Sequence, residues 1–297
     1  MSGVSDPSAS PIQSMETSVS TNNTSPADKA SSSTDHAAAQ PSGADAILTE
    51  RHGDHILIIR MHRPHRRNAF DGATAHALEA VIDAYEDDDQ LRCAILTGSD
   101  IVFSAGQDLI AATRNDRGAT QRRGGFGMMA KPPTKPIIAA VEGHALAGGL
   151  ELCLACDLIV SSRTAMMGIP EAARSLVAIG GGCFRLPKRI PYHLAMELAI
   201  TGKPWPATRF AELGLVNKLT EPGQALAGAL ELAQDVLAAG PLAVRASKQI
   251  VQHAYDWDDP DSWSKQMEYA GPVMASEDLQ EGLRAFAEKR PAVWKGR

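Results

Sequence analysis

The chain lacks several features that mark particular classes of protein. None of its apolar runs approaches the roughly 18 residues of a membrane-spanning helix. Its net charge of −6 leaves no basic excess of the kind that nucleic-acid-binding faces require. No glycine-rich fingerprint for a dinucleotide or a P-loop lies between a predicted strand and a predicted helix. We therefore expect neither a membrane nor a nucleic acid as partner, and no nucleotide-dependent redox or hydrolysis chemistry.

Cysteine is also scarce, with four residues that all lie in apolar or glycine-rich stretches. This distribution predicts reduced core thiols in a cytoplasmic protein rather than a disulfide framework. The spacing Cys153-x-x-Cys156 occurs in zinc and redox sites, but no second pair accompanies it, which favours core packing. Four histidines flank one predicted strand without a cysteine or carboxylate partner, namely His52, His55, His62 and His65. No metal site is expected.

Residues 1–45 differ in composition from the rest of the chain. Ser, Thr, Ala and Pro dominate, and large apolar residues are isolated, so this segment cannot bury enough surface to offset its ordering entropy. It has no apolar core and no arginine before Arg51, which disfavours a secretory or mitochondrial targeting peptide. We predict a disordered tail, followed by one folded unit that begins at residue 46.

The most informative stretch is 135–186. The apolar run 136–141 predicts a buried strand, the glycines at 143, 148 and 149 interrupt it, and a helix then begins with Glu151 in its first turn. A second strand, 157–162, leads to a turn that ends at Glu171. Free N–H groups at a glycine-bearing helix start can stabilise an oxyanion, and two carboxyl groups nearby can divide acid and base roles. From the residues alone, the favoured interpretation is that Glu151 merely complements the helix dipole and that Glu171 merely follows a turn.

These motifs resemble the crotonase superfamily of enoyl-CoA hydratases and isomerases. The similarity lies in the runs 135–141, 147–152, 170–171 and 181–186, in the spacing of the two glutamates, and in the loops 63–70 and 103–109. It continues from about residue 47 to residue 297. Two departures stand out: Ala147 replaces the first glycine of a GGG run, and 172–179 differs from the usual hydratase sequence.

The resemblance implies roles for particular residues. Glu151 and Glu171 would be catalytic, and the backbone N–H groups of Gln107 and Gly148 would form the oxyanion hole. The resemblance also implies contacts with coenzyme A or the acyl group in three loops, from the residues Arg66, Arg67, Ala69, Ala105, Asp108, Leu109, Ile110 and Phe126. The irregular segment 110–134 would line the acyl pocket, although a surface loop with incidental apolar residues remains an alternative.

The resemblance also implies an activity. We expect hydration of a 2-trans-enoyl-CoA to a 3-hydroxyacyl-CoA, as in fatty acid β-oxidation, with no cofactor because coenzyme A is part of the substrate. A hydro-lyase similar to carnitinyl-CoA dehydratase, an enoyl-CoA isomerase, and a non-catalytic acyl-CoA-binding protein remain alternatives.

Strands that alternate with helices predict an α/β fold. The resemblance implies the crotonase spiral of β-β-α repeats over 46–233 and a helical C-terminal oligomerisation region over 234–297, assembling as a trimer or a dimer of trimers. Strands are predicted at 55–61, 93–98 and 215–219, and helices at 224–239 and 242–255. Leu78, Val81, Ile82 and Tyr85 recur at helical spacing, and Ser276 is a candidate N-cap of the last helix.

Overall fold

The structure, a computed structural model, describes residues 46–297, and the tail predicted for residues 1–45 lies outside them. Within the described part, the larger sheet has six strands in the order β1-β2-β3-β7-β9-β12, parallel except for the pair β1 and β2. The strands are β1 (Ile47–His52), β2 (Ile56–Met61), β3 (Cys93–Thr97), β7 (Ile137–Val141), β9 (Leu158–Ser162) and β12 (Lys218–Thr220). The central strands are nearly continuous apolar runs because a parallel sheet is covered on both faces.

A smaller sheet has the strand order β11-β10-β8-β4. Its strands are β4 (Val102–Ser104), β8 (His144–Leu146), β10 (Met166–Gly168) and β11 (Trp205–Pro206), and a separate hairpin pairs β5 (Ala119–Thr120) with β6 (Gly124–Gly125). Strands β3, β7 and β9 of the larger sheet are followed by β4, β8 and β10 of the smaller one, and each pair leads into a helix. This β-β-α repeat confirms the predicted spiral.

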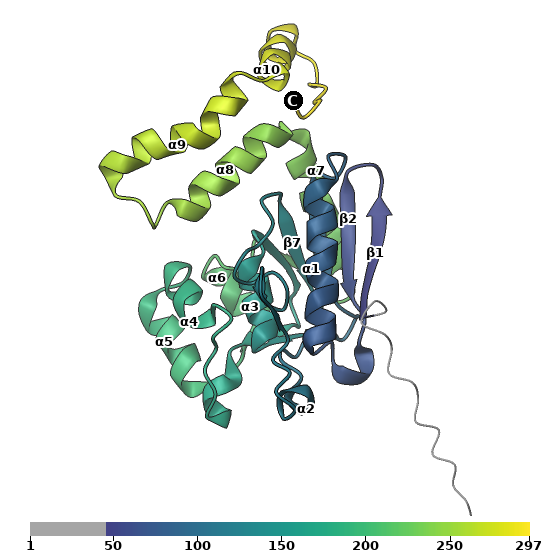
Figure 1. Cartoon of the computed structure of the whole chain (residues 1–297), viewed down its shortest axis with the longest axis vertical. Helices are drawn as coiled ribbons and strands as arrows, with labels where there is room; N and C mark the ends of the chain where they lie inside the picture. Colours follow the sequence, from purple (N-terminus) through teal and green to yellow (C-terminus); the bar gives the residue numbers. More distant parts are fainter. Residues whose placement is uncertain (1–45) are drawn as a thin grey trace, which may run out of the picture. The chain divides into compact units, whose positions relative to one another are not determined.

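Helices cover both faces of the larger sheet (Figure 1). The α-helices are α1 (Gly72–Asp87), α2 (Leu109–Ala112), α3 (Gly148–Ala155), α4 (Gly182–Arg185), α5 (Tyr192–Thr201), α6 (Ala207–Glu212), α7 (Ala225–Ala238), α8 (Pro241–His253), α9 (Asp259–Met274) and α10 (Glu277–Glu288). Three short 3₁₀ helices join them: η2 (Pro64–Arg66), η3 (Pro170–Arg174) and η4 (Leu186–Lys188). On one face, α7 packs alanines against the apolar side chains of β3, β7 and β9.

The opposite face carries the main core, to which α1 contributes. Leu78, Ile82 and Tyr85 are fully buried and Val81 packs against them, which confirms the predicted stripe. The Tyr85 hydroxyl donates a 2.7 Å hydrogen bond to the carbonyl of Pro136, so the buried polar end of this side chain is satisfied. The residue before β7 is thereby fixed against α1.

The predicted strand at 215–219 is shifted in the structure. Leu215 and Val216 are buried and donate backbone hydrogen bonds to Phe210 in a turn, and β12 starts only at Lys218. The apolar residues of this stretch pack against α6 instead of extending the sheet. The boundary proposed between the core and the C-terminal region, at 233/234, falls inside α7.

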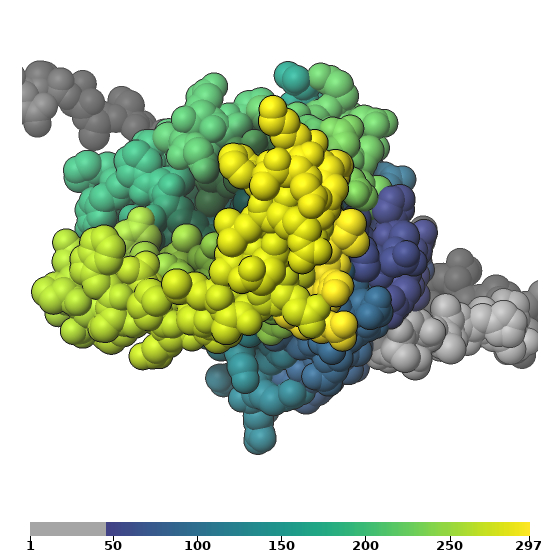
Figure 2. All heavy atoms as spheres, turned by 90° about the horizontal axis from the view of Figure 1, so that it is seen from above, coloured from purple at the N-terminus to yellow at the C-terminus, as the bar shows by residue number. Residues whose placement is uncertain are grey.

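Helices α9 and α10 follow α8 towards the C-terminus, and their residues form a continuous surface, yellow-green to yellow, in Figure 2. Ser276 caps α10 by accepting a hydrogen bond from the N–H of Leu279, as the sequence predicts. Large apolar side chains of this region are exposed, including Trp263 and Phe286. No helix within residues 46–297 combines the length and apolarity needed to cross a membrane.

Candidate active site

Glu151 lies one turn into α3 with its side chain pointing into the protein. It is only 4% exposed, and its Oε1 accepts a 2.9 Å hydrogen bond from the N–H of Gly182 at the start of α4. A Cβ at Gly180 would lie 2.6 Å from Oε2 of Glu151, so the glycine backbone packs directly against the carboxylate. The glycine run after residue 179 therefore shapes the wall around this glutamate.

Glu171 stands in the first turn of η3, half-buried. Its Oε2 is the one buried side-chain oxygen or nitrogen within residues 46–297 that has no hydrogen-bond partner. Burial raises the pKa of Glu171 to about 7, with a further contribution from the negative charge of Glu151. A buried carboxyl group without a partner, held near a second carboxyl, is arranged to exchange protons with a ligand.

The environments of the two glutamates differ, and this difference favours ionisation of one carboxyl group over the other. Burial raises the pKa of Glu151 as well, but the N–H groups of Gly182 and Gly180 and the charge of Arg185 favour its ionised form. For Glu171, only its own backbone N–H and the charge of Arg174 oppose the rise in pKa that burial and the charge of Glu151 cause. The geometry therefore favours an ionised Glu151 beside a protonated Glu171.

Arg185 is a site residue to which sequence reasoning assigned no role. Its guanidinium donates to the carbonyl of Met129 at 2.6 Å and to that of Gly180 at 3.4 Å. It thus ties the glycine run to the loop that carries Met129, while its charge acts on Glu151. The signal in the sequence is the arginine of the 181–186 motif, three residues after its second glycine, but the contacts of this arginine depend on the fold.

The two predicted oxyanion-hole amides lie at neighbouring loop ends. The N–H of Phe70 donates a 2.8 Å hydrogen bond to the carbonyl of Gly106, and the carbonyl of Phe70 accepts one of 2.8 Å from the N–H of Asp108. This pattern leaves the N–H of Gln107 without an acceptor among residues 46–297. Gly148 is the first residue of α3, where an amide has no partner inside the helix. A Cβ at Gly106 would lie 2.8 Å from the nitrogen of Gly148, so the two loops are in close contact.

Ala147, the N-cap of α3, has a backbone conformation that residues with a side chain rarely adopt, with φ 54° and ψ −128°. We expect Ala147→Gly to raise the free energy of unfolding by about 1 kcal/mol, because glycine removes this strain. Urea denaturation would measure the change. As a matched control, Ala243→Gly on the exposed surface of α8 should lower stability by about 0.5–1 kcal/mol. A loss of stability in Ala147→Gly would contradict the expectation.

Buried polar side chains brace the loops that hold these amides. The Arg63 guanidinium pairs with Asp71 at 2.6 Å and donates to the carbonyl of Ala69. Asn68 donates to the carbonyls at the end of β4, and the Ser104 hydroxyl donates 2.8 Å to the carbonyl of Asn68 while accepting from the N–H of Gly106. These positioning roles were missed, because each depends on contacts between segments distant in the sequence.

The remaining predicted binding residues occupy two loops and the pocket wall. Arg66 is half-buried, Arg67 is exposed, and neither forms an ion pair within the described residues. Ala69 is buried and Ala105 half-buried, and the side chains of Leu109 and Ile110 are about half exposed, at 50% and 52%. The structure thus presents free guanidinium groups and apolar side chains where the resemblance implies coenzyme A contacts.

Asp108 and Phe126 make contacts within the protein. The Asp108 carboxylate caps α2 by accepting from the N–H groups of Ile110 and Ala111, and it lies 3.4 Å from Arg63. Phe126 is buried and stacks on Phe70 with ring centroids 4.4 Å apart. Its ring also lies against the backbone of Gly148. Contact of Asp108 or Phe126 with a substrate stays a prediction, but Phe126 packs behind Gly148, whose amide is predicted to belong to the oxyanion hole.

The structure also shows where the cysteines lie and whether potential metal ligands are grouped. Cys153 in α3 and Cys156 at its C-cap are buried and free, as predicted for core packing, and burial raises the pKa of both thiols. The prediction of a core thiol is wrong for Cys183, which is exposed because it lies on the outer side of the short helix α4. Partial desolvation of its thiol and the charges of Glu151 and Glu171 raise its pKa. In the part of the chain that the structure describes, no three His, Cys, Asp or Glu side chains are grouped to hold a metal ion.

Comparison with known proteins matches the described unit almost throughout. A family model described as "Enoyl-CoA hydratase/isomerase" matches residues 51–297. Enoyl-CoA hydratase EchA19 of Mycobacterium tuberculosis is 39% identical over 86% of this chain and 98% of its own length. Carnitinyl-CoA dehydratase of Salmonella typhi is 38% identical over 86% of this chain and all of its own. A crystal structure of an enoyl-CoA hydratase from Mycobacterium tuberculosis H37Rv, 49% identical, superposes with a TM-score of 0.83 over 85% of this chain and 100% of that one.

Proposed function

The chain belongs to the enoyl-CoA hydratase/isomerase family, and we propose that this lyase adds water to a 2-trans-enoyl-CoA to give a 3-hydroxyacyl-CoA. One observation supports the assignment: two glutamates of different environment, Glu151 and Glu171, accompany the backbone amides of Gln107 and Gly148, which have no acceptor among residues 46–297. An isomerase needs chiefly one proton-transferring carboxyl, whereas water addition uses a base and an acid. The presence of both favours the hydro-lyase.

The proposed reaction assigns one role to each group. The amides of Gln107 and Gly148 bind the thioester oxygen and stabilise the negative charge that develops on it, each contributing about 3 kcal/mol. Ionised Glu151 takes a proton from water as the water oxygen bonds to the β-carbon. Protonated Glu171 then delivers its proton to the α-carbon, and the pair ends with one proton, as it began.

This proton balance sets the pH dependence. The active form of the pair carries one proton, and since Glu171 has a pKa of about 7, kcat/KM for hydration should fall about tenfold per pH unit above that value. Because the reaction consumes no proton, kcat/KM for dehydration should follow the same profile. Initial rates in both directions between about pH 5 and pH 9 would measure it. A rate that kept rising above neutral pH would contradict an acid role for Glu171.

The assay of choice follows loss of the conjugated thioester absorbance of crotonyl-CoA and longer enoyl-CoAs. Rapid loss, with 3-hydroxyacyl-CoA as product, supports the proposal. Conversion of 3-enoyl-CoA without water addition would instead identify an isomerase, and acyl-CoA binding without turnover a binding protein. Carnitinyl-CoA, whose dehydration would instead raise this absorbance, belongs in the panel, because the segment 172–179 departs from the usual hydratase run and carries exposed Leu176, Val177 and Ile179.

We further infer a homo-oligomer, a trimer or a dimer of trimers, acting in the cytoplasm without a cofactor other than the coenzyme A of its substrate. Exposed apolar side chains on the C-terminal helices support self-association: Trp263, Met274, Leu283 and Phe286 are between 59% and 87% exposed. Light scattering on the purified full chain would give the mass of the assembly, and a monomer would contradict this inference.

A further inference from the structure

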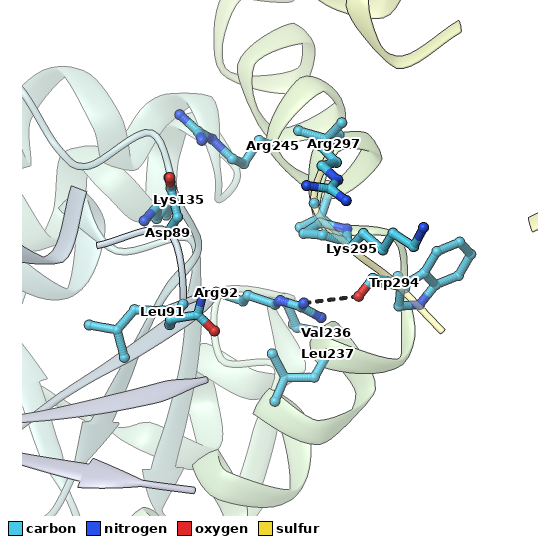
Figure 3. Close-up of a pocket in the computed structure, with 16 residues that line it drawn as sticks. Asp89, Leu91, Arg92, Lys135, Val236, Leu237, Arg245, Trp294, Lys295 and Arg297 are labelled. Atoms are coloured by element: carbon cyan, nitrogen blue, oxygen red, sulfur yellow. Dashed lines mark hydrogen bonds between the residues drawn. The ribbon is translucent and has the colours of Figure 1, made fainter. Parts of the chain in front are cut away.

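A cavity lies at the opposite end of the parallel strands from the two glutamates. The active-site loops follow the carboxyl ends of β3 and β7, whereas this cavity is lined by the residues that precede them, Leu91 and Arg92 before β3 and Lys135 before β7. Its other walls are the turn between α7 and α8 and the C-terminal segment 294–297 (Figure 3). The volume is about 510 Å³.

Charge in this cavity is strongly unbalanced. Its lining side chains include five cations and one carboxylate: Arg92, Lys135, Arg245, Lys295, Arg297 and Asp89. We call this set of residues and the space they enclose the basic cavity. Figure 3 shows the basic side chains coming from the strand ends on one side and from α8 and the C-terminal segment on the other. The whole chain is acidic, so this local excess is not a consequence of composition.

Arg92 and Arg245 have N–H groups that form no hydrogen bond within residues 46–297. Arg92 donates to the carbonyl of Trp294 at 3.1 Å and Arg245 to the Thr134 hydroxyl at 3.0 Å, and within residues 46–297 neither has an ion-pair partner. A guanidinium has five N–H donors, so most of those on both side chains remain available. Lys135, which is buried, gives its ammonium hydrogens to the carbonyls of Tyr85 and Asp88. Burial and the charge of Arg245 lower the pKa of Lys135, whereas the charges of Glu86, Asp89 and Asp88 raise it, so this ammonium is largely compensated.

Ion pairs at the rim of the cavity, formed by Lys295 and Arg297, and apolar side chains on its floor determine where an anion can bind. Lys295 and Arg297 both pair with Glu277, at 2.9 and 3.4 Å, so the rim is partly neutralised. Glu86 accepts from the Thr134 hydroxyl that Arg245 also contacts. Glu86 therefore compensates part of the charge of Arg245. The floor is apolar and comprises Leu91, Val236 and Leu237. Arg92 and Arg245 nevertheless form no ion pair within residues 46–297, and both lie above the apolar floor.

We propose that the basic cavity binds a small polyanion that carries phosphate or carboxylate groups. Guanidinium groups match the oxygens of both kinds of group bidentately. The volume lies within the range of about 300–1,000 Å³ usual for small-molecule sites. The cavity would bind its ligand independently of the acyl-CoA site, since the two lie at opposite ends of the strands.

Calorimetric titration of the full chain with pyrophosphate, ADP and citrate tests the proposal. We expect at least one of them to bind with one site per chain and a Kd below about 100 μM. Both Arg92→Gln and Arg245→Gln should weaken that binding by at least about tenfold, since each removes a guanidinium contact. Arg163→Gln, which changes an exposed arginine paired with Glu221, should leave it unchanged. Preference for pyrophosphate or ADP over citrate would assign phosphate as the ligand group, and the reverse preference carboxylate.

Two results would overturn the proposal. One is the absence of binding by all three anions to the folded protein. The other is binding that Arg66→Gln and Arg67→Gln abolish while both cavity variants retain it, because ADP would then occupy the predicted coenzyme A loop. If Arg92→Gln loosens the C-terminal segment through loss of its bond to Trp294, Arg245→Gln still tests the site, because its one hydrogen bond joins Thr134.

Discussion

Replacing Glu171 with glutamine is expected to lower kcat for crotonyl-CoA hydration by about 10³-fold or more, because the amide cannot deliver a proton to the α-carbon. The side chain keeps its size, and its Oε2 makes no hydrogen bond within residues 46–297 that the substitution would break. Loss of the conjugated thioester absorbance measures the rate. Glu212→Gln, the same change at an exposed glutamate, is the matched control and should retain full activity. Retained hydration in Glu171→Gln would contradict the acid role.

The same variant should be more stable than the parent above neutral pH. Since the folded-state pKa of Glu171 is about 7 against an ordinary value of 4.5, its stabilising contribution is fully present below 4.5 and is lost as the pH rises through about 7. Glutamine removes the cost of ionisation. Because the carboxyl is only half-buried, we expect a discounted gain of about 1 kcal/mol near pH 8. Denaturant titration at that pH would then separate a lost proton donor from a damaged fold.

The parts of the fold predicted well are those whose signal is local. The runs that became β2, β3 and β7 are continuous and apolar, and a buried parallel strand needs little else. Strands β4, β8 and β10 have three residues each, too few to show a period, and they exist only because they pair with one another. The stretch at 215–219 was placed too early because an apolar residue in a buried turn reads like one in a strand.

In the candidate site, too, the features with a local sequence signal could be predicted, and those that depend on contacts between distant segments could not. Glu151, Glu171 and the two amide positions could be predicted as site residues because they lie in motifs with fixed spacing. The contacts that set their chemistry could not be predicted: the bond from Gly182 to Glu151, the unpaired Oε2 of Glu171 and the bracing by Arg185 all join separate segments. Spacing predicts the carboxyl groups, but only the fold shows that Glu151 accepts a hydrogen bond from Gly182 while Oε2 of Glu171 has no partner within residues 46–297.

This division of roles predicts a different defect for Glu151→Gln. Hydration should again fall by about 10³-fold, since no base remains to take the proton of water. The amide oxygen can still accept the N–H of Gly182, so the glycine wall should keep its place. Glu171 is untouched, however, and can still move a proton to and from the α-carbon of a saturated acyl-CoA. We therefore expect exchange of the α-protons with deuterated solvent to persist in Glu151→Gln and to disappear in Glu171→Gln.

The exchange reaction also reports on the coupling between the two carboxyl groups. The charge of Glu151 raises the pKa of Glu171, so its removal should lower that pKa and shift the pH midpoint of exchange below about 7. Nuclear magnetic resonance of butyryl-CoA in deuterated buffer follows the loss of the α-proton signal. Glu197→Gln, at an exposed position, serves as the control for both rate and midpoint. If exchange vanished in Glu151→Gln and persisted in Glu171→Gln, the acid and base assignments would have to be reversed, because the group that serves the α-carbon would then be Glu151.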